Sequence, residues 1–256
     1  MTRVLEGKVA VITGAAGAIG TATAKLFAER GATIFAVDIA GADWSRLKAA
    51  LPEGAKLVTA EADVTDEASV KAYVDKAKTE LGRIDIFFNN AGIEGPVAPI
   101  ESYPLDAFLK VLGVNVAGVF LGLKYVLPVM YAQGSGSVIN TSSVAGLIGS
   151  PGMAGYNTSK HAVIGITRVA ATEAAPKGVR VNCVNPGPIE SRMMDSINKG
   201  QAPDAKAAHD ATSGAVPAKR YGTPEEVAGL VAFLASDDAG YCNGGFYTVD
   251  GALSAT

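Results

Sequence analysis

Tyr156 and Lys160 are four residues apart, and Ser143 precedes the tyrosine by thirteen residues. If the segment around Tyr156 is helical, positions i and i+4 share one face, so the lysine ammonium lies beside the phenol. A neighbouring positive charge favours the phenolate and lowers a phenol pKa that is ordinarily about 10. A phenol tuned in this way acts as a general acid or base, while a serine hydroxyl holds a substrate oxygen. These three residues predict chemistry that moves a proton on or off an alcohol or a ketone.

The same spacing also fits a purely structural role. Of the eight tyrosines, only Tyr156 has a lysine four residues further on. A surface lysine one helical turn beyond a half-buried tyrosine gives the identical pattern. The elements that position these residues have to decide between the two interpretations.

Short, continuously apolar segments alternate with longer helical patterns along the chain. Uninterrupted apolar strands separated by helices indicate a parallel sheet that is covered on both faces. Because crossovers between parallel strands are right-handed, we expect one α/β domain over residues 1–256, a Rossmann-like doubly wound parallel sheet of about seven strands with helices on both faces. The predicted strands are 8–13, 33–38, 56–61, 84–89, 137–141, 179–185 and 246–249, and the predicted helices are 19–30, 67–81, 105–133, 154–175 and 224–235.

One long stretch, residues 187–217, follows a predicted strand and shows no regular pattern. It is rich in alanine, serine, aspartate and methionine. A long loop after a strand of such a sheet is typical of a lid over a site. We therefore expect a substrate lid around residues 187–217.

The composition limits the classes of function. With 48% hydrophobic residues, the chain can bury a substantial core, and its net charge of −3 argues against a nucleic-acid partner. No cluster has metal-ligand spacing, so no metal is expected. Cys183 and Cys242 are typical of reduced thiols in a cytoplasmic protein, with a disulfide as the alternative. The N-terminus lacks a signal-peptide core and no apolar run is long enough to cross a bilayer, so we expect no membrane partner.

The first predicted strand ends in a glycine-rich loop, and a helix follows directly. Glycines let the backbone turn tightly and approach a pyrophosphate, and a helix N-terminus offers N–H groups and a positive dipole end. The spacing differs from the usual G-x-G-x-x-G, and a glycine cluster alone also fits an ordinary turn. The strand–turn–helix context favours a dinucleotide. The loop residues are Gly14, Gly17, Ala18, Ile19 and Gly20.

Asp38 ends the second predicted strand, eighteen residues after Gly20. An acidic side chain there accepts both hydroxyls of the adenosine ribose and repels a 2′-phosphate. No lysine or arginine lies in the glycine loop or directly after Asp38. We therefore expect NAD rather than NADP; the alternative is that Asp38 caps a turn.

Further motifs follow in a consistent order, and together they resemble the short-chain dehydrogenase/reductase (SDR) family in its ordinary form of about this length. The resemblance covers almost the whole chain. Ala18 replaces the middle glycine of the family's loop, and we expect it to be tolerated if the position needs no positive φ. Ser191 stands where threonine is common, and Ala252 where a second glycine is common. The motifs, beside the glycine loop and Ser143/Tyr156/Lys160, are Asp63-Val64, Asn89-Asn90-Ala91-Gly92, Asn115, Asn185-Pro186-Gly187-Pro188-Ile189 and Val249-Asp250-Gly251.

The resemblance implies a role for each residue. Tyr156, as phenolate, would remove the alcohol proton while hydride moves to the nicotinamide. Lys160 would lower the phenol pKa and bind the nicotinamide ribose. Ser143 would hold the substrate oxygen and Asn115 would position Lys160; for these two, ordinary helix or turn hydrogen bonding is the alternative. The implied cofactor-binding residues are Gly14, Gly17, Ala18, Ile19, Gly20, Asp38, Asp63, Val64, Asn90, Ala91, Gly92, Tyr156, Lys160, Pro186, Gly187, Ile189 and Ser191.

The candidate substrate residues are mostly apolar. They suit a hydrophobic or cyclic secondary alcohol or ketone better than a sugar. Because methionine is a common gap-filler, the two lid methionines could instead only pack the lid. The candidates are Ile93, Glu94, Ile148, Met153, Pro188, Met193 and Met194.

Two other functions stay open at this point. A 3-oxoacyl-carrier-protein reductase shares the resemblance, but such enzymes usually use NADP, which Asp38 opposes, and the basic residues of the lid are matched by acidic ones. A non-catalytic NAD-binding sensor could use the same fold. The intact set of Ser143, Tyr156 and Lys160 opposes that interpretation. The resemblance also implies a homotetramer.

Overall fold

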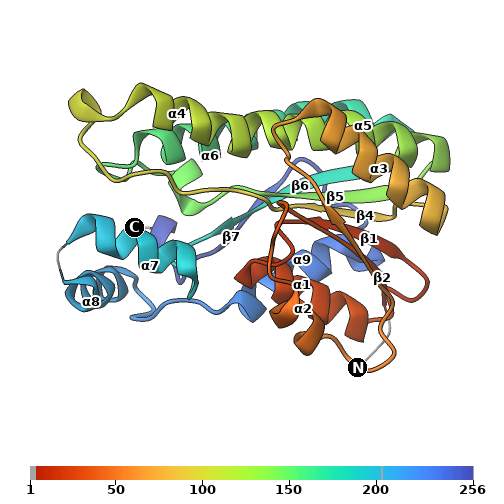
Figure 1. Cartoon of the computed structure of the whole chain (residues 1–256), viewed down its shortest axis with the longest axis horizontal. Helices are drawn as coiled ribbons and strands as arrows, with labels where there is room; N and C mark the ends of the chain where they lie inside the picture. The colour runs from red at the N-terminus through yellow and green to blue at the C-terminus, as the bar shows by residue number, and fades with distance from the viewer. Residues whose placement is uncertain (1–3, 203, 256) are drawn as a thin grey trace.

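The computed structural model describes residues 4–202 and 204–255 (Figure 1). Seven strands form one fully parallel sheet in the order β3-β2-β1-β4-β5-β6-β7, which confirms the predicted doubly wound α/β fold. The seven predicted strands agree with the observed ones to within two residues at each end. The strands are β1 (Val9–Thr13), β2 (Thr33–Asp38), β3 (Leu57–Glu61), β4 (Ile86–Asn89), β5 (Gly136–Thr141), β6 (Val179–Pro186) and β7 (Phe246–Val249).

Helices cover both faces of the sheet (Figure 1). One layer holds α1 (Ala18–Glu29), α2 (Ser45–Ala50) and α9 (Pro224–Ala235), and the other holds α3 (Glu67–Leu81), α4 (Leu105–Leu112), α5 (Gly118–Gln133) and α6 (Ala154–Ala174). Successive strand residues point to opposite layers: Val11 belongs to the core under α3 and α5, whereas Ala10 and Ile12 belong to the core under α1 and α9. This two-sided burial is why the strands are apolar without alternation.

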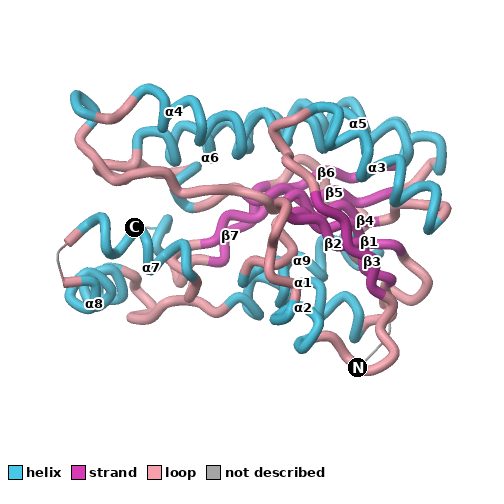
Figure 2. Tube along the Cα trace, in the orientation of Figure 1, coloured by secondary structure: helices cyan, strands magenta, loops and turns pink. Residues whose placement is uncertain are grey.

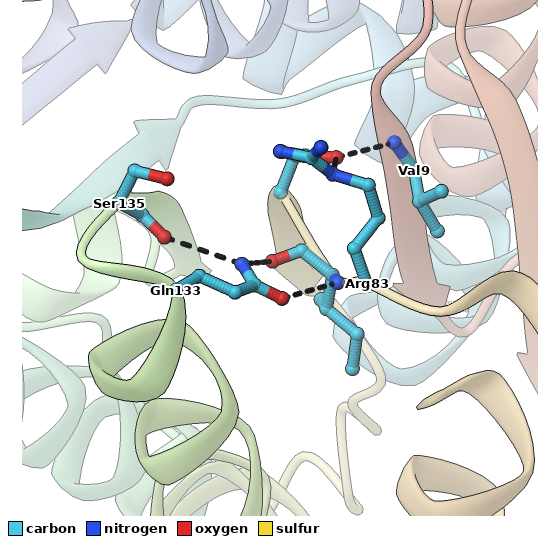
Figure 3. Close-up of polar contacts among 6 residues, drawn as sticks. Val9, Arg83, Gln133 and Ser135 are labelled. Carbon is cyan, nitrogen blue, oxygen red and sulfur yellow. Dashed lines mark hydrogen bonds and ion pairs between the residues drawn. The ribbon is translucent and has the colours of Figure 1, made fainter. Parts of the chain in front are cut away.

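A set of polar contacts holds the amino ends of β1 and β4 beside the end of α5 (Figure 3). The buried carboxylate of Asp85 accepts hydrogen bonds from Val9 N at 2.9 Å and from the Arg83 guanidinium at 2.6 and 2.8 Å. Gln133, the last residue of α5, accepts from Ile84 N at 2.9 Å and donates to Ile84 O at 2.8 Å. These contacts fix the registration of the sheet at the edge opposite the strand carboxyl ends.

The expectation that residues 187–217 have no regular structure is wrong, because two helices occupy most of this stretch (Figure 2). Its role as a substrate lid stays a prediction. They are α7 (Arg192–Gln201) and α8 (Ala205–Ala215). Each begins at a side-chain cap: Ser191 Oγ accepts from Met194 N, and Asp204 accepts from the first backbone N–H groups of α8. Glycines inside both helices and their small, polar residues weaken the helical pattern that sequence reasoning uses. Helix α2 is also absent from the sequence prediction.

The predicted helix 105–133 is interrupted by a π-helical turn, Gly113–Ala117. The turn carries Asn115, which is buried. By length and composition the whole stretch Leu105–Gln133 could cross a membrane, so the expectation that no apolar run is long enough is wrong. Half of its most apolar part is buried inside the protein, as is typical of a core helix in a sheet-covering layer.

Candidate active site

The carboxyl ends of strands β1 to β6 meet at one edge of the sheet and border a cavity of about 710 Å³. Ligands of open α/β sheets bind at this edge, because the loops that follow the strands converge there. The cavity wall includes most of the predicted cofactor and catalytic residues, namely Gly14, Gly17, Ala18, Ile19, Asp38, Asp63, Val64, Asn90, Ala91, Gly92, Ser143, Tyr156, Lys160, Pro186, Gly187, Ile189 and Ser191.

The glycine loop after β1 depends on two close backbone approaches. Gly14 has a φ of +64°, and a Cβ there would lie 3.0 Å from the Cα of Ala91. A Cβ on Gly20 would lie 2.2 Å from the carbonyl oxygen of Gly14. Gly20 is therefore required for packing α1 against its own loop and does not line the cavity. Helix α1 begins at Ala18 without a side-chain cap, so its first N–H groups suit a phosphate oxygen.

The alanine that replaces the family's middle glycine fits this loop. Among the described non-glycine residues, only Lys219 and Ala252 have a positive φ. Ala18 therefore has an ordinary backbone conformation, and the expectation that its methyl group is tolerated is confirmed in this respect. By contrast, Ala252 has a φ of 71°, a conformation that favours glycine.

Asp38 projects from the end of β2 toward the glycine loop. Its carboxylate accepts hydrogen bonds from Ala16 N at 2.9 Å and from Ile39 N at 2.8 Å. The turn-capping role is therefore present, and it holds the carboxylate at the cavity wall. A carboxylate has about four acceptor sites, so both oxygens keep capacity for ribose hydroxyls.

Helix α6 places Tyr156 and Lys160 on one face, as the spacing predicts. The Nζ atom of Lys160 lies 5.4 Å from the centroid of the Tyr156 ring and donates a hydrogen bond to Thr141 O at 2.9 Å. Ser143, two residues after the end of β5, donates to Pro186 O at 3.3 Å and accepts from Ala145 N at 3.1 Å. Strands β5 and β6 and helix α6 thus bring the three residues to the same wall of the cavity.

The net effect of the surrounding protein is to raise the pKa of Tyr156. Burial raises the pKa of Tyr156 to about 12, a hydrogen bond with Ser143 opposes this rise, and the charge of Glu94 adds to it. Burial also lowers the pKa of Lys160 to about 8, so the lysine stays mostly protonated at pH 7. Desolvation is the largest influence on the Tyr156 phenol, and the expectation that Lys160 lowers its pKa stays a prediction.

Asn115 lies behind the cavity wall and acts on neighbouring backbone. Its side chain accepts from Ile93 N at 2.9 Å and donates to Ile93 O at 2.9 Å and to Ser159 Oγ at 3.0 Å. A Cβ on Gly92 would lie 3.2 Å from Asn115 Oδ1 and 3.5 Å from Lys160 Nζ. Asn115 thus holds the segment after β4 next to the lysine, with Gly92 leaving room for both.

The far part of the cavity, which we call the α7 end, has a mostly apolar wall. Six of the seven predicted substrate residues line it; Glu94 does not, and instead pairs with Arg192. Sequence reasoning missed several residues here because they lie on the unpredicted helices α7 and α8 or in loops without a motif. The α7 end comprises Ile93, Ile148, Ser150, Met153, Pro188, Arg192, Met193, Met194, Ile197, Gln201, Thr212 and Leu253.

Comparison with known proteins relates this chain to characterised oxidoreductases. Residues 14–254 match a family model described as enoyl-(acyl carrier protein) reductase. The chain is 44% identical to levodione reductase of Leifsonia aquatica over 97% of this chain and 94% of that protein. It is 37% identical to cyclohexanol dehydrogenase of an Acinetobacter species, over 100% of this chain and 98% of that protein. It is also 42% identical to the 3-oxoacyl-[acyl-carrier-protein] reductase of Thermotoga maritima, over 97% and 98%.

Solved structures agree with these sequence relationships. A crystal structure of levodione reductase superposes with a TM-score of 0.97 at 42% identity, covering 98% of this chain and 99% of the other. An NAD⁺-bound xylitol dehydrogenase superposes with a TM-score of 0.92 at 38% identity, covering 96% and 99%. Both similarities therefore extend over nearly the whole chain. The chain is therefore a member of the short-chain dehydrogenase/reductase family.

Proposed function

We propose that this protein is an NAD-dependent oxidoreductase that interconverts a secondary alcohol and a ketone, with a hydrophobic, cyclic substrate. The observation that carries the proposal is the position of Tyr156. Its side chain lines the cavity between the glycine-loop region and the α7 end, together with Ser143 and Lys160. Two relatives are named for cyclic compounds, levodione and cyclohexanol, and the apolar α7 end suits such a ring.

The protein groups suit the proton transfer in both directions. With its raised pKa, neutral Tyr156 can donate its hydroxyl proton to a ketone oxygen as hydride reaches the carbonyl carbon. Ser143 would donate a hydrogen bond to the same oxygen and stabilise its developing charge. In alcohol oxidation, Tyr156 has to accept the proton as a phenolate. A bound oxidised nicotinamide would supply a positive charge that favours this phenolate, and Lys160 would add to it when protonated.

NAD is proposed over NADP because of the charge at the adenosine end of the cavity. Asp38 is held there by Ala16 N and Ile39 N, and Asp43 and Asp63 also line this part of the wall. Three carboxylates would repel a 2′-phosphate, whereas ribose hydroxyls can donate to Asp38. The similarity to an NAD⁺-bound xylitol dehydrogenase supports this choice. We further propose a cytoplasmic homotetramer that uses the exposed Leu105, Leu109 and Phe120 surface of α4 and α5.

A 3-oxoacyl-carrier-protein reductase is the second candidate, since one relative has that activity by name. An acidic carrier needs exposed basic residues near the cavity mouth. Of the basic residues on α7 and α8, Arg192 pairs with Glu94 and Lys206 pairs with Asp210 at 2.7 Å. This pairing, with Asp38, favours the first candidate. A non-catalytic NAD-binding sensor is the third candidate function.

The deciding experiment follows the absorbance of NADH, which changes as the nicotinamide is reduced or oxidised. Purified protein is tested with cyclic secondary alcohols, cyclic ketones and an acetoacetyl thioester, each with both cofactors. We expect turnover of the cyclic substrates with NAD(H). Activity confined to the thioester would favour the carrier-protein reductase, and silence across the panel with retained NAD binding would favour the sensor.

A further inference from the structure

A largely buried carboxylate lies next to the α7 end of the cavity. Glu94 follows the Asn90-Ala91-Gly92 segment, and its side chain is only 12% exposed. It accepts from Arg192 Nη1 at 3.3 Å, across 98 residues of sequence. Arg192 is the first residue of α7; its side chain is largely exposed, and the residue lines the cavity. The ion pair therefore connects the segment after β4 with the helix that borders the α7 end.

Arg192 is the only charged residue among the twelve described residues of the α7 end. A guanidinium at this position is the group best able to recruit a substrate carboxylate, because its N–H groups match carboxylate geometry. Glu94 already accepts a hydrogen bond from this guanidinium, and its negative charge offsets the positive charge of Arg192. A substrate carboxylate would have to displace or approach an existing carboxylate.

The charge of Glu94 also reaches the reacting centre. It raises the pKa of Tyr156, so its field acts on the phenol oxygen. A carboxylate on the substrate ring would enter the same field. Apolar side chains such as Ile93, Met153 and Met193 line the α7 end. They screen the repulsion between Glu94 and a substrate carboxylate less than water does.

We propose that Glu94 makes this site selective for uncharged alcohols and ketones, by neutralising Arg192 and by repelling a carboxylate on the substrate. The inference rests on the proposed function. It adds that the hydrophobic substrate carries no charge. It also assigns the selectivity against carboxylates to Glu94, a residue outside the cavity wall.

The first test uses two substrates of the same shape, 4-hydroxycyclohexanecarboxamide and 4-hydroxycyclohexanecarboxylate. Four proteins give a series of charges at the ion pair: the parent and the double variant Glu94→Gln/Arg192→Gln are neutral, Glu94→Gln is positive and Arg192→Gln is negative. We expect Glu94→Gln to raise the carboxylate/carboxamide ratio of kcat/KM by about tenfold at low ionic strength. Arg192→Gln should lower the ratio, and the double variant should return it toward the parent value.

A ratio that stays within about twofold of the parent in Glu94→Gln would overturn the proposal. So would a ratio that changes equally in both single variants, since a structural disturbance of α7 does not depend on the sign of the charge. Because the ratio compares two substrates in one protein, a general loss of activity in a variant cancels.

A binding measurement separates this proposal from the proposed function. Calorimetric titration with cyclohexanecarboxylate and cyclohexanecarboxamide, in the presence and absence of NADH, needs no turnover. Glu94→Gln should tighten carboxylate binding at least about fivefold relative to the carboxamide. If cyclohexanol and the hydroxy ring compounds are not oxidised, the proposed function fails while the titration still decides the charge selectivity. The proposed charge selectivity is overturned if Glu94→Gln does not tighten carboxylate binding relative to carboxamide binding. It is also overturned if neither compound binds.

Discussion

The ammonium nitrogen of Lys160 lies 5.4 Å from the ring centroid of Tyr156, yet its hydrogen bond goes to the carbonyl oxygen of Thr141. The lysine is therefore held by the end of β5 rather than by the phenol. This arrangement leaves the Tyr156 hydroxyl to Ser143 and the cavity, and it leaves the lysine charge under the control of its own burial. Both consequences can be tested.

Replacing Tyr156 by phenylalanine should nearly abolish turnover, by about 10³-fold or more in kcat, while NAD binding changes little. The phenol is the proposed proton donor and acceptor, and the substitution keeps the aromatic ring. Steady-state kinetics and calorimetric NAD titration measure the two effects. Tyr241→Phe is the matched control, since Tyr241 is fully exposed. Retention of most activity in Tyr156→Phe would exclude the mechanism.

The buried Lys160 makes stability depend on pH. Its pKa in the folded protein, about 8, lies below the ordinary value of 10.5, so the unfolded chain binds more protons between these two values. Stability from this residue therefore rises with pH across that window. Lys160→Met should lack this pH-dependent rise in the free energy of unfolding. Between pH 7 and 10, the free energy of unfolding of the parent should therefore increase by about 2 kcal/mol relative to that of the variant. Urea unfolding over this range measures it; a constant difference would show that the lysine titrates normally.

Replacing Asp38 by asparagine should shift cofactor preference toward NADP by about tenfold or more in the ratio of kcat/KM values. The substitution keeps the shape and one acceptor for Ala16 N or Ile39 N but removes the charge that opposes a 2′-phosphate. Asp75→Asn serves as the control, since Asp75 forms an exposed ion pair with Lys71 and does not line the cavity. Equal efficiency of the parent with NAD and NADP, or an equal shift in the control, would contradict the assignment.

The polar anchor of Figure 3 should contribute to stability and not to catalysis. Asp85→Asn leaves one carbonyl oxygen for Val9 N and two Arg83 nitrogens, so at least one of these donors loses its acceptor. We expect a loss of about 2 kcal/mol in the free energy of unfolding with kcat unchanged. The control, Asp75→Asn, removes an exposed ion pair with Lys71 and should cost less than about 0.5 kcal/mol. Similar losses in the two variants would sink this account.

Sequence reasoning succeeded where the signal is local. The strand before Gly14 and the strand ending at Asp38 are continuously apolar, because both faces of the sheet are covered, and their ends are marked by glycine or a charge. The i, i+4 relation of Tyr156 and Lys160 needs only a helix, which α6 supplies.

Sequence reasoning failed where local signals for and against a helix are of similar strength. Helices α7 and α8 have capping residues, Ser191 and Asp204, that signal a helix start. Their internal glycines oppose this signal, and their packing at the cavity decides the outcome. Ala252 is the opposite case: the structure explains why glycine is common there, since φ is 71°, but the sequence shows only a departure from the family.

The sequence by itself determined the fold class, the family and the positions of the groups that could do chemistry, because periodicity and motif spacing are properties of the chain. Only the tertiary structure decided how those groups behave. Burial raises the pKa of Tyr156, and Glu94 meets Arg192 across 98 residues. Desolvation and long-range charge pairing depend on which atoms surround a group in space, and spacing along the chain carries no such information.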